Sequence, residues 1–310
     1  MRAFIFPGQG SQAVGMGSAL ADASAAARAV FQEVDDALGQ NLSRLMREGP
    51  DDQLMLTENA QPAIMANAIA VLRVLEAGGV RLADKSDFVA GHSLGEYTAL
   101  CAAEAFDLAT TARLLKVRGE AMQAAVPVGE GAMAVLLGLD FDAAAAVAAE
   151  AADGEVCQAA NDNGGGQVVI SGHAGAVARA MELAKERGAK RALPLAVSAP
   201  FHCSLMAPAA DVMDAALAAV AMQGPLVPVY ANVTAAPVTD PDDIRRLLVQ
   251  QVTGTVRWRE SVEAMWTAGV TEVVEFGGKV LSPMVKRIAP DMVTRSVVSM
   301  DDVEALAKEI

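Results

Sequence analysis

Aromatic residues are scarce in this chain of 310 residues, which contains eight Phe, two Trp and two Tyr although 53% of it is hydrophobic. The core must therefore be built mainly from Ala, Val, Leu and Met. The length is sufficient for a sizeable core, either in one large domain or in a large domain that carries a smaller insert.

Cysteine is also rare, with three residues at positions 101, 157 and 203. Their number is odd and no two of them have the CxxC spacing, so a disulfide framework and a cysteine zinc site are both disfavoured. We expect reduced thiols and a cytoplasmic protein.

Positive charge is in deficit, because 24 Lys and Arg stand against 38 Asp and Glu and give a net charge of -14. Proteins that bind nucleic acid normally carry a basic stripe, so this function class is disfavoured. Anionic ligands are not excluded, since they need only a local cluster of Lys or Arg.

Long hydrophobic runs are absent as well. The apolar run at the amino terminus covers four residues before Pro7, which is too short for a signal peptide. No later segment reads as a membrane span. We therefore expect a soluble, cytosolic protein that does not associate with membranes.

Strand and helix patterns alternate along the first part of the chain, which predicts a mostly parallel sheet covered by helices. The first strand ends in the glycine-rich "FPGQGSQ". Further strands are predicted at 87–91, 227–233 and 272–276. Helices are predicted at 18–39, 60–77, about 95–105, 108–126, 207–221, 241–252, 259–268 and within 277–288.

From 128 to 197 the predicted strands and helices follow a different order, the β-α-β-β-α-β order of a ferredoxin-like unit. Asp140 is the expected cap of its first helix. The strands are predicted within 131–139, 155–163, 166–172 and 189–197. We expect an α/β protein with a large domain over 1–127 and 198–310 and an inserted small subdomain over 128–197.

The stretch "VAGHSLGEYTAL" at 89–100 places Ser93 between Gly91 and Gly95, where a strand turns into a helix. This G-x-S-x-G pattern is typical of a nucleophile elbow, a turn so tight that glycine is required beside the serine. The alternative is an ordinary strand-to-helix turn that contains a serine.

An activated serine needs a base, and the chain contains three histidines. His92 adjoins Ser93 and is expected to pack or hydrogen-bond within the turn. His173 begins a predicted helix, where a surface or capping role is expected. His202, in "SAPFHCSLM", is the best base by elimination, although a buried core histidine is the alternative. No acid that would orient it stands out.

Eight motifs in order resemble the malonyl-CoA:acyl-carrier-protein transacylase family, and together they span residues 4 to about 288. The resemblance implies an α/β-hydrolase-like core with a ferredoxin-like insert, in agreement with the pattern above. The motifs are "FPGQGSQ", "QPAI", "GHSLGEYTAL", "KVRGEAMQ", "GAMAVLLGL", "GQVVISGH", "AKRALPL" and "PFHCSLM".

The same resemblance implies catalytic roles. Ser93 would carry the malonyl ester, and His202 would act as general base and acid. The backbone carbonyl of Gln251 would orient His202, although the neighbouring Gln250 could take this role. The backbone N–H groups of Gln9 and Leu94 would form the oxyanion hole.

Substrate-binding roles follow from the resemblance too. Arg118 would bind the free carboxylate of malonate, because a planar guanidinium can bind a carboxylate with two hydrogen bonds. Without the resemblance, a solvated charge on a helix is the alternative. Gln61 and Asn161 would line the pocket, and Phe201 would leave little room for an α-methyl branch. "EFGGKVL" lacks the proline of the family's Gly-Pro-Gly turn, so an altered loop shape is expected.

The function implied is a two-step acyl transfer from malonyl-CoA to acyl carrier protein for fatty-acid synthesis, by a monomer that needs no metal or redox cofactor. A serine esterase and a non-catalytic carrier-binding module are the alternatives. The carrier's phosphopantetheine would accept the malonyl group. The surface of this chain that docks the carrier protein is predicted at Lys190 and Arg191, beside Lys185 and Arg187. A second basic cluster is at Lys279, Lys286 and Arg287.

Overall fold

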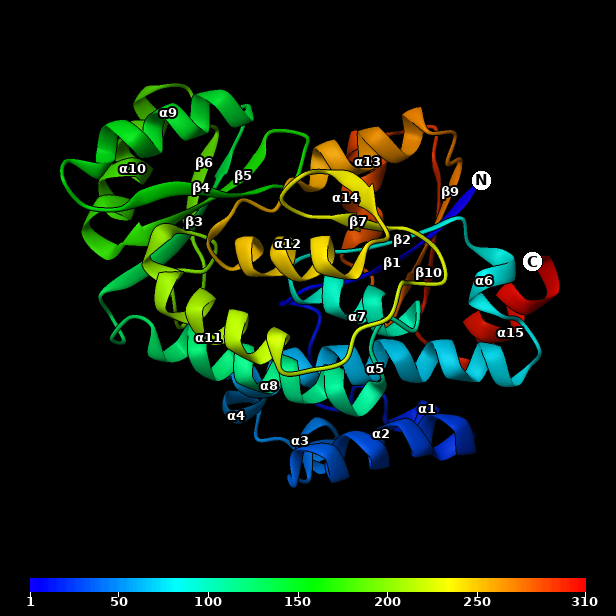
Figure 1. Cartoon of the computed structure of the whole chain (residues 1–310). Coiled ribbons are helices and arrows are strands. Elements are labelled where there is room, and N and C mark those ends of the chain that lie inside the picture. The colour runs from blue at the N-terminus through cyan, green and yellow to red at the C-terminus, as the bar shows by residue number, and fades with distance from the viewer.

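Two sheets organise the chain in the computed structural model, which describes residues 1–310 (Figure 1). The larger sheet has six strands in the order β10-β9-β1-β2-β7-β8, and β8 alone pairs in antiparallel fashion. The predicted α/β class and mostly parallel sheet are therefore confirmed. Its strands are β1 (Arg2–Phe6), β2 (Phe88–Gly91), β7 (Val229–Ala231), β8 (Ala236–Val238), β9 (Glu272–Phe276) and β10 (Val293–Val297).

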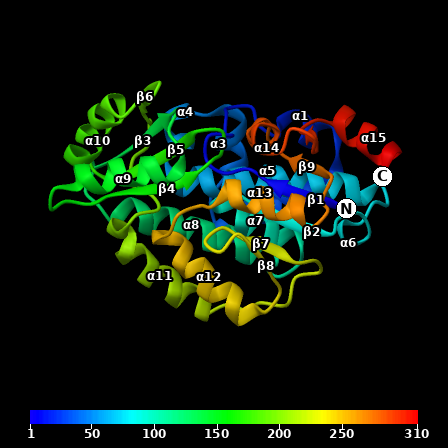
Figure 2. The same cartoon turned by 90° about the horizontal axis from the view of Figure 1, so that it is seen from above.

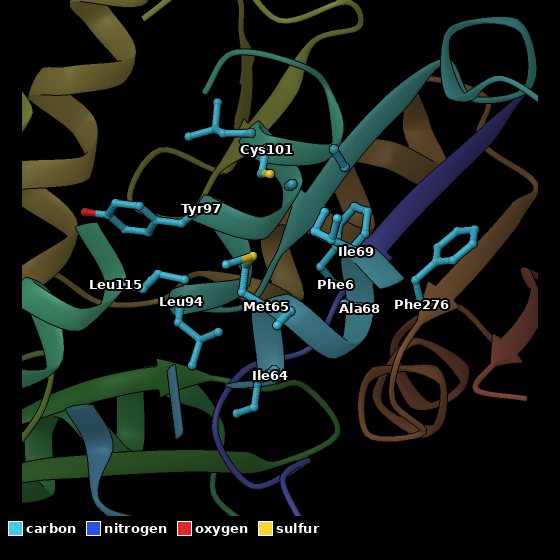
Figure 3. Packing of buried hydrophobic residues seen from close by; sticks show 14 of the residues in the cluster. Phe6, Ile64, Met65, Ala68, Ile69, Leu94, Tyr97, Cys101, Leu115 and Phe276 are labelled. Carbon is cyan, nitrogen blue, oxygen red and sulfur yellow. The ribbon is translucent and has the colours of Figure 1, made fainter. Parts of the chain in front are cut away.

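The strand β1 shows why this sheet is covered on both faces. Its residues Ala3 to Phe6 are all apolar and fully buried, a pattern typical of parallel strands between two helical layers. Phe4 and Phe6 face the layer that contains α5, and both rings lie near that of Phe276. Figure 3 shows Phe6 and Phe276 among the buried side chains of this layer. Ala3 and Ile5 pack on the other face, against α13 and α14.

The helix α5 forms the centre of the first layer and is buried over most of its length. In Figure 3 its residues Ile64, Met65, Ala68 and Ile69 lie among side chains of the sheet and of α7. The helices of the large part of the molecule are α1 (Ser18–Ala23), α2 (Ala25–Leu38), α3 (Leu42–Glu48), α4 (Asp51–Met55), α5 (Thr57–Ala77), α6 (Leu82–Lys85), α7 (Leu94–Ala102), α8 (Leu108–Ala124), the short 3₁₀ helix η1 (Ser204–Met206), α11 (Ala207–Ala218), α12 (Pro241–Thr253), α13 (Trp258–Thr267), α14 (Leu281–Ile288) and α15 (Met300–Glu309).

The smaller sheet has the antiparallel order β4-β5-β3-β6, and the chain order β-α-β-β-α-β is the predicted one. Asp140 caps its first helix by accepting a hydrogen bond from the backbone N–H of Ala143 at 2.8 Å, as expected. Figure 2 shows this unit at the end of the molecule away from both termini. Its elements are β3 (Gly131–Leu137), α9 (Phe141–Ala152), β4 (Cys157–Asp162), β5 (Gln167–His173), α10 (Ala174–Glu186) and β6 (Arg191–Pro194). The domain boundaries at 128 and 197 stay a prediction.

One strand-like contact joins the small sheet to the segment between α12 and α13. Asn161 of β4 forms a parallel bridge with Val256, and the backbone N–H of Val256 donates to Ala160 O at 2.9 Å. Asp162 also accepts a hydrogen bond from Arg259 at 2.9 Å. The carboxyl end of β4 is thereby held against the large part of the molecule.

Some element boundaries differ from those that the sequence predicted. The helix expected over 18–39 is two helices, because Ser24 adopts an extended conformation and its side chain caps α2. The helix α7 ends at Ala102, and the strand expected over 189–197 is limited to β6. The elements β8, β10, α3, α4, α6 and α15 were not anticipated. None of the helices is both long and apolar enough to cross a membrane.

Candidate active site

Ser93 occupies the turn between β2 and α7 with the strained backbone angles φ 55° and ψ -114°. The flanking glycines are required by close packing. A Cβ on Gly91 would lie 1.9 Å from the carbonyl carbon of Gly95, and a Cβ on Gly95 would lie 2.2 Å from Phe6 O. The sharp turn that the G-x-S-x-G pattern predicts is therefore present.

His202 lies beside Ser93, with 2.7 Å between His202 Nε2 and Ser93 Oγ. Its Nδ1 is 2.9 Å from Gln251 O and 3.2 Å from Gly254 O. Because carbonyl oxygens only accept, Nδ1 carries the proton and Nε2 is free to accept the serine proton. The carbonyl partner thus comes from Gln251 and not from the alternative Gln250.

The electrostatics of the site keep His202 neutral. Burial, together with the positive charge of Arg118, lowers the pKa of His202 to about 3. A histidine with this pKa is unprotonated at neutral pH, which is the form that a general base requires.

Arg118 comes from α8 and is only 1% exposed, so it is not a solvated surface charge. Its guanidinium donates to Gln61 Oε1 at 2.7 Å and to Gln251 Oε1 at 2.8 Å. It also donates to Ser93 Oγ at 3.1 Å. Burial lowers the pKa of Arg118, and the neighbouring Tyr97 and Glu96 oppose this shift. A guanidinium retains its charge even so.

A cavity of about 270 Å³ opens above Ser93 between the two sheets. Apolar side chains, among them Met122, Met133, Leu195 and Val197, form much of its wall. Eight of the residues predicted for the site line it, namely Gln9, Gln61, Ser93, Leu94, Arg118, Asn161, Phe201 and His202.

The remaining predicted residues lie outside the cavity wall. Gln251 contacts the site through its carbonyl and its side chain, as described above. Lys190 and Arg191 are exposed at the start of β6 and line no part of the cavity. The backbone N–H groups of Gln9 and Leu94 have no hydrogen-bond acceptor within the chain, so both are available to a bound group.

The two other histidines do not contact the serine hydroxyl. His92 Nε2 is 2.9 Å from Asn163 Oδ1, and its ring lies 5.8 Å from that of Trp258. Burial lowers the pKa of His92. His173 precedes α10 without capping it, and its Nδ1 accepts a hydrogen bond from the backbone N–H of Val156.

Sequence reasoning missed two residues of the site, Asn232 and Glu96. Asn232 Oδ1 accepts the backbone N–H of Ser93 at 2.8 Å, and its Nδ2 donates to Gly91 O at 2.7 Å. Glu96 accepts hydrogen bonds from Gln251 Nε2 at 2.9 Å and from the N–H of Asn232 at 3.0 Å. The one available signal was the acidic residue within the otherwise apolar "LGEYTALCA".

Comparisons with known proteins agree with this geometry. The model of the "Acyl transferase domain" family matches residues 3–278. The Malonyl CoA-acyl carrier protein transacylase of Bacillus subtilis (strain 168) is 45% identical over 304 residues, which cover 97% of this chain and 95% of the relative. The chain belongs to this transacylase family. The predicted family and fold are thereby confirmed.

Solved structures of the transacylase family match over almost the whole chain. An acyl-carrier-protein S-malonyltransferase from Bartonella henselae is 53% identical, with a TM-score of 0.97, over 99% of this chain and 98% of that one. A malonyl-transacylase solved in complex with its type II PKS acyl-carrier protein is 40% identical, with a TM-score of 0.96, over 100% and 99% of the two chains.

Gly277 and Gly278 stand where the transacylase family has its Gly-Pro-Gly turn, and both lie in close contact with other parts of the chain. Gly277 has a φ of 78°, and a Cβ there would lie 2.6 Å from Ala68 Cα in α5. A Cβ on Gly278 would lie 2.8 Å from Pro7 Cγ. Both glycines are therefore in close contact with neighbouring residues, and the altered loop shape stays a prediction.

Proposed function

We propose that this chain transfers the malonyl group of malonyl-CoA to the phosphopantetheine thiol of acyl carrier protein, through an ester on Ser93, in support of fatty-acid synthesis. The observation that carries this proposal is the buried guanidinium of Arg118, 3.1 Å from Ser93 Oγ inside the cavity. The carboxylate of a malonyl ester lies three bonds from that oxygen, within reach of the guanidinium. An esterase for neutral acyl groups would have no use for this cation.

The first half-reaction begins with proton transfer from Ser93 Oγ to His202 Nε2 as the oxygen attacks the thioester carbonyl. The N–H groups of Gln9 and Leu94 stabilise the negative charge on the carbonyl oxygen. The C–S bond then breaks, and His202 returns the proton to the sulfur of CoA. Gln251 O holds the Nδ1 proton throughout, so the ring keeps its orientation.

The second half-reaction runs the same steps with the carrier's thiol. His202 takes the thiol proton, the sulfur attacks the malonyl ester, and Ser93 Oγ regains its proton when the C–O bond breaks. Arg118 binds the acyl carboxylate in both half-reactions. Gln61 and Asn161 line the space beside it, and Phe201 narrows the pocket against branched acyl groups.

The nucleophile can be tested by replacement. Ser93→Ala should abolish both the malonyl adduct and the transfer to carrier protein, measured by intact mass after incubation with malonyl-CoA. The fold should survive, because the change removes one hydroxyl group from a turn. Ser204→Ala, at an exposed position outside the cavity, is the matched control and should form the adduct normally. Turnover by the Ser93→Ala variant would contradict the acyl-serine mechanism.

We propose Lys190 and Arg191 as part of the carrier-docking surface. Both are exposed, and neither has a carboxylate partner. Their neighbours are neutralised, since Lys185 pairs with Glu182 and Arg187 pairs with Glu150, each at 2.7 Å. The free cations therefore supply most of the local attraction for an acidic carrier.

One residue of the second basic cluster, Arg287, is linked to Lys190 through the backbone of Gly138, Gly165 and Gly166. A Cβ on Gly138 would lie 2.8 Å from Lys190 Cγ, and Gly138 N donates to Gly166 O. Gly165 in turn packs against the side chain of Arg287. Lys190 and Arg287 thus belong to one surface that crosses from the small sheet to α14.

The docking proposal predicts that Lys190→Glu/Arg191→Glu raises the apparent KM for carrier protein and leaves the acylation of Ser93 by malonyl-CoA unchanged. The effect should weaken with added salt, because screening at about 0.1 M acts over roughly 10 Å. Lys185→Glu/Arg187→Glu is the matched control and should have the smaller effect. Unchanged carrier kinetics of the first variant at low salt would contradict the assignment.

We propose a monomer that acts in the cytoplasm. The three cysteines are buried and form no disulfide, which supports a reducing compartment. Sedimentation of the purified protein would test the oligomeric state.

A further inference from the structure

Glu96 is a buried carboxylate that the proposed mechanism does not use. It lies in the first turn of α7, three residues after Ser93, and is 1% exposed. It has no salt bridge to a Lys or Arg. Its Oε2 accepts hydrogen bonds from Gln251 Nε2 and from the backbone N–H of Asn232. Burial of a charge is costly unless it is compensated, so this arrangement needs an explanation.

The carboxylate fixes the orientation of the Gln251 amide. Gln251 Nε2 faces three acceptors. They are Glu96 Oε2 at 2.9 Å, Ser93 O at 3.0 Å and Asn232 Oδ1 at 3.4 Å. Gln251 Oε1 faces the Arg118 guanidinium at 2.8 Å. A flipped amide would place its oxygen against a carboxylate and its NH₂ group against a cation. Glu96 and Arg118 are therefore connected through a single amide whose orientation their charges determine.

The two hydrogen-bond donors to Glu96, Gln251 and Asn232, also support His202 and Ser93. Gln251 provides the backbone carbonyl that accepts the Nδ1 proton of His202. Asn232, whose N–H donates to Glu96, holds the backbone N–H of Ser93 through its side chain. Glu96 thus lies behind both the base and the nucleophile without touching either of the reacting atoms.

We propose that Glu96 is a positioning residue that acts through Gln251 on Arg118 and His202, and that its negative charge balances Arg118 when no acyl carboxylate is bound. This inference rests on the proposed malonyl transfer. A malonyl carboxylate brings a second negative charge to Arg118, whereas an acetyl group brings none. Removal of the charge on Glu96 should therefore favour malonyl over acetyl.

The titration of Glu96 provides a readout that packing alone would not give. Burial raises the pKa of Glu96 to about 7, opposed by its hydrogen bonds and by Arg118. Arg118 is the charged group that faces it from α8, while Gln251 of α12 and Asn232 after β7 face it with neutral amides.

The other titratable groups nearby do not change charge near neutral pH. Burial raises the pKa of Tyr97 far above its usual range. The pKa of His202 is lowered to about 3, and burial also lowers the pKa of His92. A change in acyl selectivity between about pH 6 and 8 therefore reports on Glu96.

The test compares Glu96→Gln and Glu96→Ala with the wild-type chain in rates of Ser93 acylation by malonyl-CoA and by acetyl-CoA, followed by quenched-flow intact mass. Glu96→Ala removes the acceptor and should slow both acylations by roughly ten- to a hundredfold. Glu96→Gln keeps an acceptor oxygen and should restore most of the acetyl rate. It should also raise the malonyl-to-acetyl ratio.

The pH dependence completes the test. The wild-type ratio should rise as the pH falls through about 7, because Glu96 then loses its charge, and in the Glu96→Gln variant the ratio should not change over this range. Glu275→Gln is the matched control. Glu275 is fully buried and accepts hydrogen bonds from Val280, Leu281 and Ser282 outside the cavity, so its replacement should leave the ratio unchanged.

Three results would overturn the inference: wild-type rates in Glu96→Ala, equal losses in Glu96→Ala and Glu96→Gln, or an unchanged ratio in Glu96→Gln. If Glu96→Ala does not fold, the ratio in Glu96→Gln and its pH profile decide the question. Failure of the proposed function itself would look different, because the wild-type chain would then form no malonyl adduct.

Discussion

Replacement of Arg118 by Met gives the sharpest test of the substrate assignment, because Met fills similar space without a charge. Arg118 donates to Gln61, Gln251 and Ser93 at 2.7, 2.8 and 3.1 Å in a site that is almost fully buried. Loss of one partner of a buried charge pair costs about 2–5 kcal/mol. Malonyl transfer should therefore fall by roughly 30- to 5,000-fold, since about 1.4 kcal/mol corresponds to a factor of ten.

Acetyl transfer should respond differently. An acetyl group has no carboxylate to pair with the guanidinium, so its transfer loses only the positioning of the neighbouring amides. The malonyl-to-acetyl ratio of kcat/KM should collapse. Arg118→Lys is the companion variant, and it should recover part of the malonyl rate because it keeps the charge without the planar fork.

The same change should lower the stability of the fold. Without Arg118, the pKa of Glu96 should rise further above about 7, so the carboxyl group binds a proton near neutral pH and the loss of stability should grow as the pH rises. The double variant Arg118→Met/Glu96→Gln removes both charges and should recover much of the free energy of unfolding in urea titrations. It should not recover malonyl selectivity.

The assay is kcat/KM for both acyl-CoA substrates with holo carrier protein, alongside a urea titration of each variant. Equal falls for malonyl and acetyl transfer in folded Arg118→Met would refute the reasoning, since they would mean that Arg118 only supports the structure of the site.

Two further predictions concern the strained turn and the base. Gly95→Ala should lower the free energy of unfolding by about 1–3 kcal/mol or more and abolish acylation, because its Cβ would lie 2.2 Å from Phe6 O; an unchanged urea midpoint would contradict this. His202→Asn should gain stability relative to the wild type as the pH falls from about 6.5 towards 3, by up to about 1.4 kcal/mol per pH unit. In this window the unfolded wild-type chain binds a proton at His202, whereas the folded chain does not, because its His202 has a pKa of about 3. Parallel stability curves for variant and wild type would contradict the second prediction.

Local sequence signals were sufficient for much of the fold. Gly91 and Gly95 mark the elbow because the backbones approach too closely for any side chain, a requirement that is visible in the sequence itself. The small subdomain was predictable because its elements have a clear hydrophobic period and local boundary signals, such as the N-cap residue Asp140 at the start of α9. The subdivision at Ser24 was missed because the alanines on both sides favour one continuous helix.

The rest of the site depends on contacts that local patterns cannot report. Asn232 reaches Ser93 only because β7 is the neighbour of β2 in the sheet, although the two residues are 139 positions apart. The neutralisation of Arg187 depends on Glu150, which lies in another helix. Arg118 has the sequence setting of any helical arginine, and its burial follows from how α5, α7 and α8 pack together. Strand order and helix packing, more than motif, therefore decide which polar residues meet.

The absence of an acid behind His202 has an electrostatic reason in this site. Two carbonyls, of Gln251 and Gly254, hold the Nδ1 proton, and they orient the ring without adding a negative charge. An aspartate in their place would raise the pKa of His202, but it would also stand close to Arg118 and to any carboxylate bound there. With Glu96 already present, a second fixed acid would compete with the acyl carboxylate for the one buried guanidinium. A serine nucleophile that must accept an anionic acyl group is thus better served by a neutral orienting group than by the carboxylate of a hydrolase triad.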